Sequence, residues 1–235
     1  MTKIAVCLLA YNEQDVISDV IEDGYKYLDS LNINFELWVF DNNSNDNTAA
    51  IVEKLQKEKE RLKYYKQDSN VGYGLNTISA LKIPNADIIF VLDGDGQYSF
   101  NDIPKFSKLI NDGCDVMFGF RKNRKDRFIR KITTIIYNFL ARIIIKSDLS
   151  DINCGFRALN SKSAKKIVSR FKYNYIGAEI FMESKKYNFN VGESEVEHNH
   201  RSAGNSVFNN LNLIAKNSLI MAKHLVELRN IYFKK

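Results

Sequence analysis

Two aspartates separated by one glycine, Asp93-Gly94-Asp95, follow an apolar run that ends at Leu92. Glycine relaxes the backbone and adds no side chain, so both carboxylates can reach one hard cation. Such a cation would bind the diphosphate of an activated substrate and neutralise the charge that develops on it as it leaves. Many Asp-Gly-Asp triplets are ordinary surface turns. The triplet therefore needs support from the rest of the chain.

Two further polar clusters follow apolar runs: Tyr11-Asn12-Glu13 and Asp41-Asn42-Asn43-Ser44. Short apolar runs alternate with longer amphipathic segments, which is the rhythm of a parallel sheet flanked by helices. Ligands of such sheets bind beyond the carboxyl ends of the strands, so the three clusters are expected at one crevice. The expected strands are Lys3 to Ala10, Phe35 to Phe40, Leu62 to Lys66, Asp87 to Leu92 and Asp115 to Phe118, and the expected helices begin near Glu13, Asp46, Gly72 and Asn101.

The second half of the chain is more irregular, and nothing in it marks a domain boundary or a repeat. We expect one α/β domain over residues 1–235, whose first half, 1–120, has the pattern of a nucleotide-binding layered fold. The second half, 121–235, is predicted to hold helices at Lys125 to Lys146, Ser161 to Arg170, Gly177 to Tyr187 and Val207 to about Arg229, a loop at Asp151 to Leu159, and a strand at Asn190 to Glu197.

Several functional classes lose support from what the sequence lacks. It contains neither G-x-G-x-x-G after the first strand nor a P-loop, which disfavours dinucleotide oxidoreductases and P-loop hydrolases. Its three cysteines are odd in number and widely spaced, which fits a reducing compartment better than a disulfide framework. Apolar runs are too short to span a bilayer, and no signal-peptide cleavage pattern follows the first one. We expect a cytoplasmic protein.

Positive charge is concentrated rather than spread, although the net charge is only +6. A basic cluster within eleven residues predicts an anionic ligand. Its members are Arg121, Lys122, Arg124, Lys125, Arg127, Arg130 and Lys131. The predicted helix from Lys125 to Lys146 has an apolar stripe and its basic residues near the N-terminal end, so it could pack on the core, lie on an anionic membrane surface, or do both.

The clusters together resemble family 2 glycosyltransferases of the GT-A fold. The motifs that carry the resemblance are Ala10-Tyr11-Asn12-Glu13, the segment from Asp41 to Thr48, and Asp93-Gly94-Asp95-Gly96-Gln97. Other motifs are similar to those of the dolichyl- or polyprenyl-phosphate hexose synthase branch. They are Asn70-Val71-Gly72-Tyr73-Gly74, Gly119-Phe120-Arg121, Arg130 to Thr134, Asp151 to Leu159, and His200 to Ser206.

The resemblance implies a nucleotide-sugar-binding half at 1–120 and an acceptor half at 121–235, with a nucleotide-sugar site and a metal site. The nucleotide sugar, a UDP- or GDP-hexose, would contact Ala10, Tyr11, Glu13, Asp41, Asn43, Gly72, Asp93 and Gly94. Mg²⁺ or Mn²⁺ would be held at Asp93, Asp95 and Gln97, with Asp95 and Gln97 as direct ligands and Asp93 at the ribose or the metal's outer shell. Leu9 replaces the family's usual proline and Asn42-Asn43 its Asp-Gly, so the nucleobase and the sugar stay open.

The expected reaction is a single displacement with inversion at the anomeric carbon. The resemblance places Asp151, Arg121, Arg130 and Arg201 at the reacting groups, and guanidinium forks suit phosphate oxygens. If the acceptor is a hydroxyl, Asp151 would be the general base. If it is a polyprenyl phosphate, whose second ionisation lies near pH 6, Asp151 would only position it. A turn-forming role for Asp151 is a third possibility.

Three functions follow, in order of preference. The first is hexose transfer to a polyprenyl phosphate, with peripheral membrane contact. The second is transfer to a hydroxyl of a glycan or other soluble acceptor. A basic nucleic-acid-binding module is a remote third, because it leaves the acidic motifs unexplained; no nucleic-acid partner is expected. The oligomeric state stays open.

Overall fold

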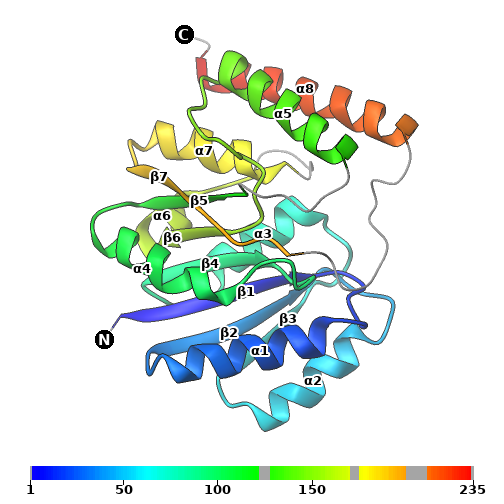
Figure 1. Cartoon of the computed structure of the whole chain (residues 1–235), viewed down its shortest axis with the longest axis vertical. Coiled ribbons are helices and arrows are strands. Elements are labelled where there is room, and N and C mark those ends of the chain that lie inside the picture. The colour runs from blue at the N-terminus through cyan, green and yellow to red at the C-terminus, as the bar shows by residue number, and fades with distance from the viewer. Residues whose placement is uncertain (1, 122–127, 170–174, 200–210, 234–235) are drawn as a thin grey trace.

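The computed structural model describes residues 2–121, 128–169, 175–199 and 211–233, with the side chains of 128–132 and 211–218 excepted. These residues form a seven-stranded sheet in the order β3-β2-β1-β4-β6-β5-β7 (Figure 1). Its strands are β1 (Lys3–Ala10), β2 (Asn34–Asp41), β3 (Leu62–Lys66), β4 (Ile88–Asp93), β5 (Val116–Phe120), β6 (Arg157–Asn160) and β7 (Val191–Glu195). All neighbouring pairs are parallel except those that β6 makes.

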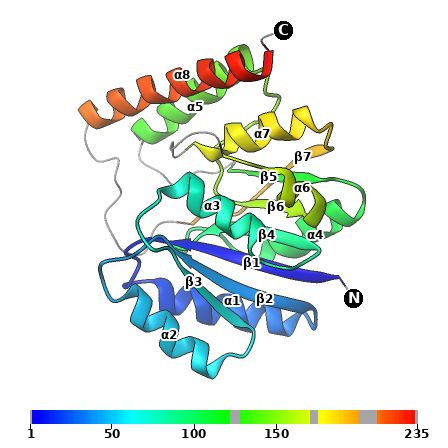
Figure 2. The ribbon, with the colours of Figure 1, turned by 180° about the vertical axis from the view of Figure 1, so that it is seen from behind.

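Helices cover both faces of this sheet. On one face α1 (Ile17–Ser30), α2 (Thr48–Glu58) and α4 (Ile103–Asn111) pack in one hydrophobic cluster, and the 3-10 helix η1 (Phe100–Asp102) leads into α4. On the other face α3 (Tyr73–Lys82), α6 (Ser161–Lys166) and α7 (Ile176–Lys186) pack in a second cluster (Figure 2).

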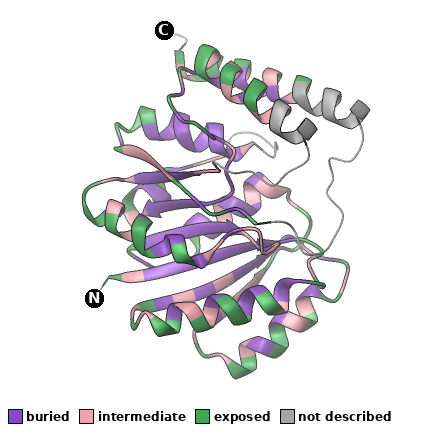
Figure 3. Ribbon diagram, in the orientation of Figure 1, coloured by how far each residue is buried: buried purple, intermediate pink, exposed green. Residues whose placement is uncertain are grey.

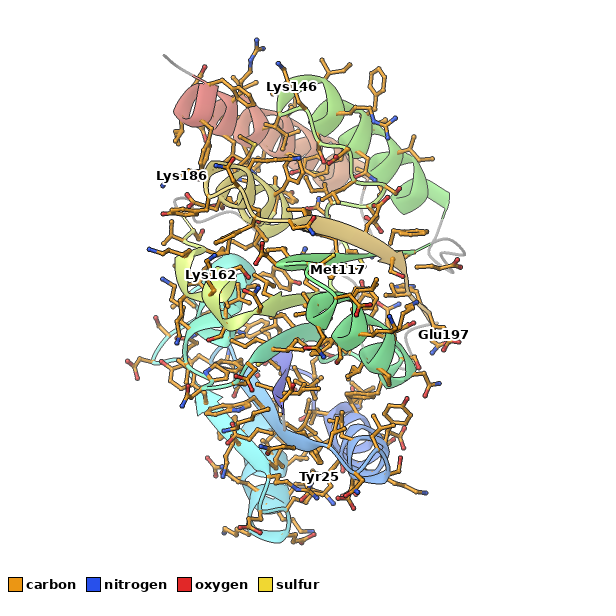
Figure 4. The ribbon with its side chains drawn as sticks, turned by 90° about the vertical axis from the view of Figure 1, so that its left-hand side faces the viewer. Tyr25, Met117, Lys146, Lys162, Lys186 and Glu197 are labelled. Atoms are coloured by element: carbon orange, nitrogen blue, oxygen red, sulfur yellow. The ribbon has the colours of Figure 1, made fainter. Side chains whose placement is uncertain are left out.

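A helix pair forms a further layer beyond α7. It consists of α5 (Phe128–Ile144) and α8 (Leu211–Phe233), which pack side by side. Viewed from the side in Figure 4, Lys146 lies beside this pair, Met117 lies in the sheet, and Tyr25 on α1 lies toward the opposite end of the molecule. No described helix is both long enough and apolar enough to cross a membrane.

The central strand β1 shows why the sheet is buried on both sides. Its sequence is a nearly unbroken apolar run, which is typical of a parallel strand covered by helices on both faces. Ala5, Cys7 and Leu9 belong to the cluster under α3, whereas Val6 and Leu8 belong to the cluster under α1. Figure 3 accordingly shows the inner strands as almost wholly buried.

The predicted α/β fold with a mostly parallel sheet is confirmed, and the main error concerns β6. We expected a loop from Asp151 to Leu159, but the last part of this segment is an antiparallel strand between β4 and β5. Arg157 pairs with both Val91 and Phe118, so a segment assigned to the acceptor half completes the sheet of the other half.

Several helix boundaries also differ from the prediction. The first two helices begin at Ile17 and Thr48 rather than near Glu13 and Asp46, because the intervening residues form the loops described below. The helix expected to reach Arg170 ends at Lys166. The last described helix continues beyond Arg229 to Phe233. Residues 122–127 and 207–210, where two helices were expected to begin, lie outside the described residues.

Candidate active site

The three acidic and amide-rich clusters lie at adjacent strand ends. In the sheet register, Ala10 at the end of β1 pairs with Asp41 at the end of β2. On its other side, Leu9 of β1 pairs with Asp93 at the end of β4. The expected convergence on one edge of the sheet therefore follows from the parallel pairing.

The loops after β1 and β2 are joined by side-chain bonds to backbone amides. Ser44 Oγ accepts from the Asn12 amide at 2.9 Å, and Asn12 Oδ1 accepts from the Asn45 amide at 2.9 Å. Thr48 Oγ1 accepts from the Glu13 amide at 2.9 Å. Asn12 is in the left-handed region, with φ of +56°, which asparagine tolerates better than most residues. The short polar residues of both motifs thus build one continuous loop structure.

Asp41 lies inside this loop structure and is fully buried. Its Oδ1 accepts from the amide and the hydroxyl of Ser44, at 2.8 and 2.6 Å, and its Oδ2 accepts from Tyr64 at 2.8 Å. Burial, and next the hydrogen bond to Asp41, raise the pKa of Tyr64, so this phenol stays a donor. Asp41 therefore fixes Ser44 and Tyr64 from inside the loop structure, and its predicted contact with the nucleoside stays a prediction. Tyr11, 41% exposed, is the member of the predicted set that faces solvent most.

The departure Asn42-Asn43 has a structural explanation. Asn43 has φ of +61°, the conformation for which the family's glycine is suited and which asparagine also adopts. Asn42 reaches the loop before α3, where its Oδ1 accepts from the Val71 amide and its Nδ2 donates to Asn70 Oδ1, both at 2.9 Å. Gly72 follows with φ of +83° and caps the N-terminus of α3, which begins at Tyr73. Asn42 thus joins the loop after β2 to the loop before α3, and Asn43 allows the backbone to turn beside it.

The turn after β4 differs from the prediction in the role of its glycines. We expected Gly94 to supply backbone freedom, yet Gly96 is the residue with positive φ, at +75°. Gly94 instead allows close packing, because its amide donates to the Leu9 carbonyl at 2.8 Å and a Cβ would lie 2.9 Å from that oxygen. Asp95 Oδ1 accepts from the Gln97 amide at 3.1 Å, which closes the turn.

Asp93 is held between α3 and the segment before β6. Its Oδ1 accepts from the Tyr73 hydroxyl at 2.9 Å. A Cβ at Gly155 would lie 2.7 Å from Asp93 Cγ and nearer still to Oδ2, so the carboxylate rests on this glycine. Burial, and next the Asp93 charge, raise the pKa of Tyr73, whereas the nearby Arg157 guanidinium opposes the rise.

Gln97 links the turn at residues 93–97, which is predicted to hold the metal ion and which we call the metal turn, to the segment after β7. Its Nε2 donates to the Asn199 carbonyl at 3.1 Å, and the Asn199 amide donates to the Gln97 carbonyl at 2.8 Å. Next to this contact, Tyr98 forms an isolated bridge with His198, and their rings meet edge-on at 5.2 Å. His198 therefore packs against Tyr98 at the rim of the site.

Arg121 and Asp151 form a buried ion pair. Arg121 Nε donates to Asp151 Oδ2 at 2.6 Å and Nη2 donates to Oδ1 at 3.0 Å, with side chains only 9% and 6% exposed. Burial opposes the charge of Arg121, but Tyr98, Cys154 and Asp151 together raise its pKa. We expected Arg121 to face a phosphate group and Asp151 to face the acceptor, but in the structure the two side chains bind each other.

The metal turn carries the oxygen donors that a hard cation prefers. Within the described ranges, no group of three or more His, Cys, Asp or Glu side chains could hold a metal ion alone. Asp93, Asp95 and Gln97 nevertheless offer oxygen donors on one turn. Mg²⁺ in particular binds through one or two carboxylates completed by substrate phosphates and water. The donor set fits a cation that arrives with a diphosphate.

Two predicted site residues lie where the structure describes no side chain, and three residues that contact the site were missed by the sequence analysis. The side chain of Arg130 and the whole of Arg201 lie outside the described residues. Tyr64, Tyr73 and Arg157 were not singled out, although they contact Asp41 and Asp93 directly or through one another. Tyr73 and Arg157 belong to two of the motifs that carry the family resemblance, and these motifs could have indicated both residues.

Comparison with known proteins identifies a matching sequence family and solved structures with a similar fold. The sequence model described as "Glycosyl transferase family 2" matches residues 5–168. The structure of glucosyl-3-phosphoglycerate synthase from Mycobacterium tuberculosis with Mn²⁺, UDP and phosphoglyceric acid has a TM-score of 0.70 at 15% identity, covering 98% of this chain and 78% of that one. The same enzyme with Mn²⁺, UDP-glucose and glycerol 3-phosphate gives 0.66 at 17% identity, covering 96% and 80%. At such identities the likeness concerns the fold.

Proposed function

Because this chain belongs to glycosyl transferase family 2, we propose that it moves a hexose from a nucleotide-diphosphate sugar to a polyprenyl phosphate, with inversion at the anomeric carbon. The donor would lie over the joined loops after β1 and β2 and extend its diphosphate to the turn after β4. The acceptor would approach from the side of Arg121 and Asp151.

The Arg121–Asp151 ion pair carries the proposal. A hydroxyl acceptor needs a base to take its proton, but both Asp151 oxygens accept hydrogen bonds from a buried guanidinium. A carboxylate so engaged directs its oxygens at the guanidinium fork rather than at an acceptor hydroxyl. A phosphate monoester is already largely dianionic at neutral pH and needs only orientation. Asp151 would then hold Arg121, and Nη1, the guanidinium nitrogen that does not bind Asp151, would meet a phosphate oxygen.

The donor side of the proposal depends on Mg²⁺ or Mn²⁺ at Asp95 and Gln97, with Asp93 beside them. When bound, the cation would neutralise charge on the departing diphosphate. Hydrogen bonding of Asp95 to the Gln97 amide holds the turn in place before any ligand arrives. The Mycobacterium tuberculosis neighbours, obtained with Mn²⁺ and UDP, support this assignment by analogy of fold.

An apolar outer surface supports a lipid acceptor. Several large hydrophobic side chains of α5 and α8 are exposed, and Phe139 is 61% exposed. The exposed residues are Ile135, Ile136, Phe139 and Ile143 on α5, and Leu219, Val226, Ile231 and Phe233 on α8. On α5 all but Ile136 recur every fourth residue, and on α8 all but Ile231 recur every seventh, which places most of each set along one stripe of its helix. Tyr137 and Ala141 of α5 are buried, so this helix packs on the core and could also contact a membrane.

A second candidate is transfer to a soluble phosphorylated acceptor or another soluble hydroxyl compound. The observation that favours it is the presence of phosphoglyceric acid and glycerol 3-phosphate in the neighbouring structures. Arg121 could orient such a phosphate equally well, so the two candidates differ mainly in the need for a base and in the lipid.

Transfer assays with radiolabelled UDP- and GDP-hexoses and Mn²⁺ would separate the candidates. The acceptors would be a short polyprenyl phosphate in detergent, the matching polyprenol, and 3-phosphoglycerate. We expect product with the polyprenyl phosphate alone, with inverted configuration, and none from Asp95→Ala. Product with 3-phosphoglycerate but not with the lipid would favour the second candidate. Retained configuration would refute the single displacement.

A further inference from the structure

The Asp93 carboxylate is constrained by residues that no step above assigns to the reaction. Tyr73, at the start of α3, donates to its Oδ1 at 2.9 Å. Gly155, before β6, provides the bare backbone against which the carboxylate lies. The Gly155 amide in turn donates to the Tyr98 hydroxyl at 2.8 Å, which fixes this backbone. The carboxylate therefore has a donor on one side and a steric limit on the other.

Arg157 extends the arrangement beneath Tyr73. It is 1% exposed and is the largest of the fully buried side chains in the described structure. Its guanidinium contacts the Tyr73 hydroxyl. Within the same described ranges, its Nε and Nη1 have no hydrogen-bond partner. A buried guanidinium requires negative charge nearby, and Asp93, one hydroxyl away, supplies it.

We propose that Tyr73 is a positioning residue for Asp93, anchored by Arg157, and that it holds the carboxylate in the orientation that serves the metal and the donor diphosphate. Without the hydroxyl, Asp93 could rotate about χ1 and χ2 between its other staggered arrangements. Outer hydrogen-bond partners of metal-site carboxylates act in this way and commonly change metal affinity. The inference rests on the proposed metal-dependent donor site.

The role of Tyr73 can be tested by measuring the affinity of the protein for Mn²⁺ in the presence of saturating UDP. Calorimetry and the electron paramagnetic resonance signal of free Mn²⁺ would both give this affinity. Tyr73→Phe removes one oxygen and keeps the ring. The matched control is Tyr65→Phe, since Tyr65 also packs, partly buried, against the same hydrophobic cluster. We expect Tyr73→Phe to weaken Mn²⁺ binding about 10-fold and the control to leave it unchanged, with similar melting temperatures for both.

Arg157→Lys and Arg157→Met provide a second, independent comparison. Lysine keeps the charge near Tyr73 and methionine does not, so we expect Arg157→Lys to retain the tighter Mn²⁺ binding of the two. Gly155→Ala should also weaken binding, because its methyl would displace the carboxylate. Mn²⁺ affinity of Tyr73→Phe within twofold of the unmodified protein, or an equal loss in Tyr65→Phe, would overturn the proposal.

The results that would contradict the proposed function differ from those that would contradict the role of Tyr73. If the unmodified protein binds Mn²⁺ with UDP but glycosylates no polyprenyl phosphate, the acceptor assignment is wrong and the role of Tyr73 still stands on metal affinity. If the unmodified protein binds no Mn²⁺ in the presence of either UDP or GDP, the metal site and the role of Tyr73 are both wrong.

Discussion

Replacing Asp151 by asparagine should destabilise the protein more than it slows catalysis. The substitution keeps the size of the side chain and one acceptor oxygen but removes the negative charge. Arg121 then stays buried without its counter-ion, and removal of one partner from a buried pair typically costs about 3–5 kcal/mol. Both side chains are under one tenth exposed, so solvent screens the pair little.

We expect the loss of stability in Asp151→Asn to lie near the lower end of that range. Asparagine still accepts one hydrogen bond from the guanidinium, so we expect a loss of about 3 kcal/mol in the free energy of unfolding. For a chain of 235 residues, that corresponds to a fall in melting temperature of about 6–12 °C. Urea unfolding and differential scanning calorimetry would measure the two quantities.

A double-mutant cycle would show whether the loss belongs to the pair. Arg121→Met alone leaves Asp151 buried and unpaired, whereas the double variant with Asp151→Asn removes both charges. We expect the double variant to be more stable than the sum of the single effects predicts, with a coupling energy of about 2 kcal/mol. With polyprenyl phosphate, Asp151→Asn should raise KM for the acceptor more than it lowers kcat.

Two results would refute this reasoning. Additivity of the two single changes within about 0.5 kcal/mol would mean that the pair contributes no coupling. A fall in kcat of about 100-fold or more with an unchanged melting temperature would identify Asp151 as a general base instead, and would favour a hydroxyl acceptor.

Asp95→Ala should damage transfer more than Asp93→Ala, and equal tolerance of both changes in the Mn²⁺-dependent assay would contradict the assignment of Asp95 as a direct ligand. Asn43→Ala should cost about 1 kcal/mol in urea unfolding because its φ is positive, and Asn43→Gly should cost less. Phe139→Glu, on the exposed stripe of α5, should leave stability within about 0.5 kcal/mol but reduce sedimentation with anionic vesicles; unchanged sedimentation would argue against membrane contact through this surface. Cys114 should react with a thiol reagent before the two buried cysteines, and faster as pH rises toward its raised pKa; equal rates for all three would contradict their burial.

The parallel part of the sheet could be predicted because its signals are local. Apolar runs, such as the one that forms β1, and the polar clusters after them specify strand ends without knowledge of neighbours. β6 could not be predicted in this way, since a four-residue segment containing Arg157 becomes a strand only by pairing with β4 and β5. Its identity depends on residues more than 30 positions away.

For the candidate site, too, the sequence predicted the local features and not the contacts between distant segments. Residue types and spacing indicated the metal turn and the two loops, because acidic and amide side chains at strand ends are informative by themselves. Contacts between distant segments were not indicated. Examples are the bond from Tyr73 to Asp93 and the ion pair between Arg121 and Asp151. One sequence shows that these residues exist but not which of them meet.

The position of β6 constrains the order in which the chain can fold. Strand β5 pairs only with β6 and β7 in the described sheet, and both follow it in the sequence. During synthesis, β1 to β4 can assemble as they emerge, but β5 has no neighbour until residue 160 has been made. Because the same delay applies to Gly155, the wall against which Asp93 rests forms late, and a nascent chain should acquire metal affinity only after its sheet is closed.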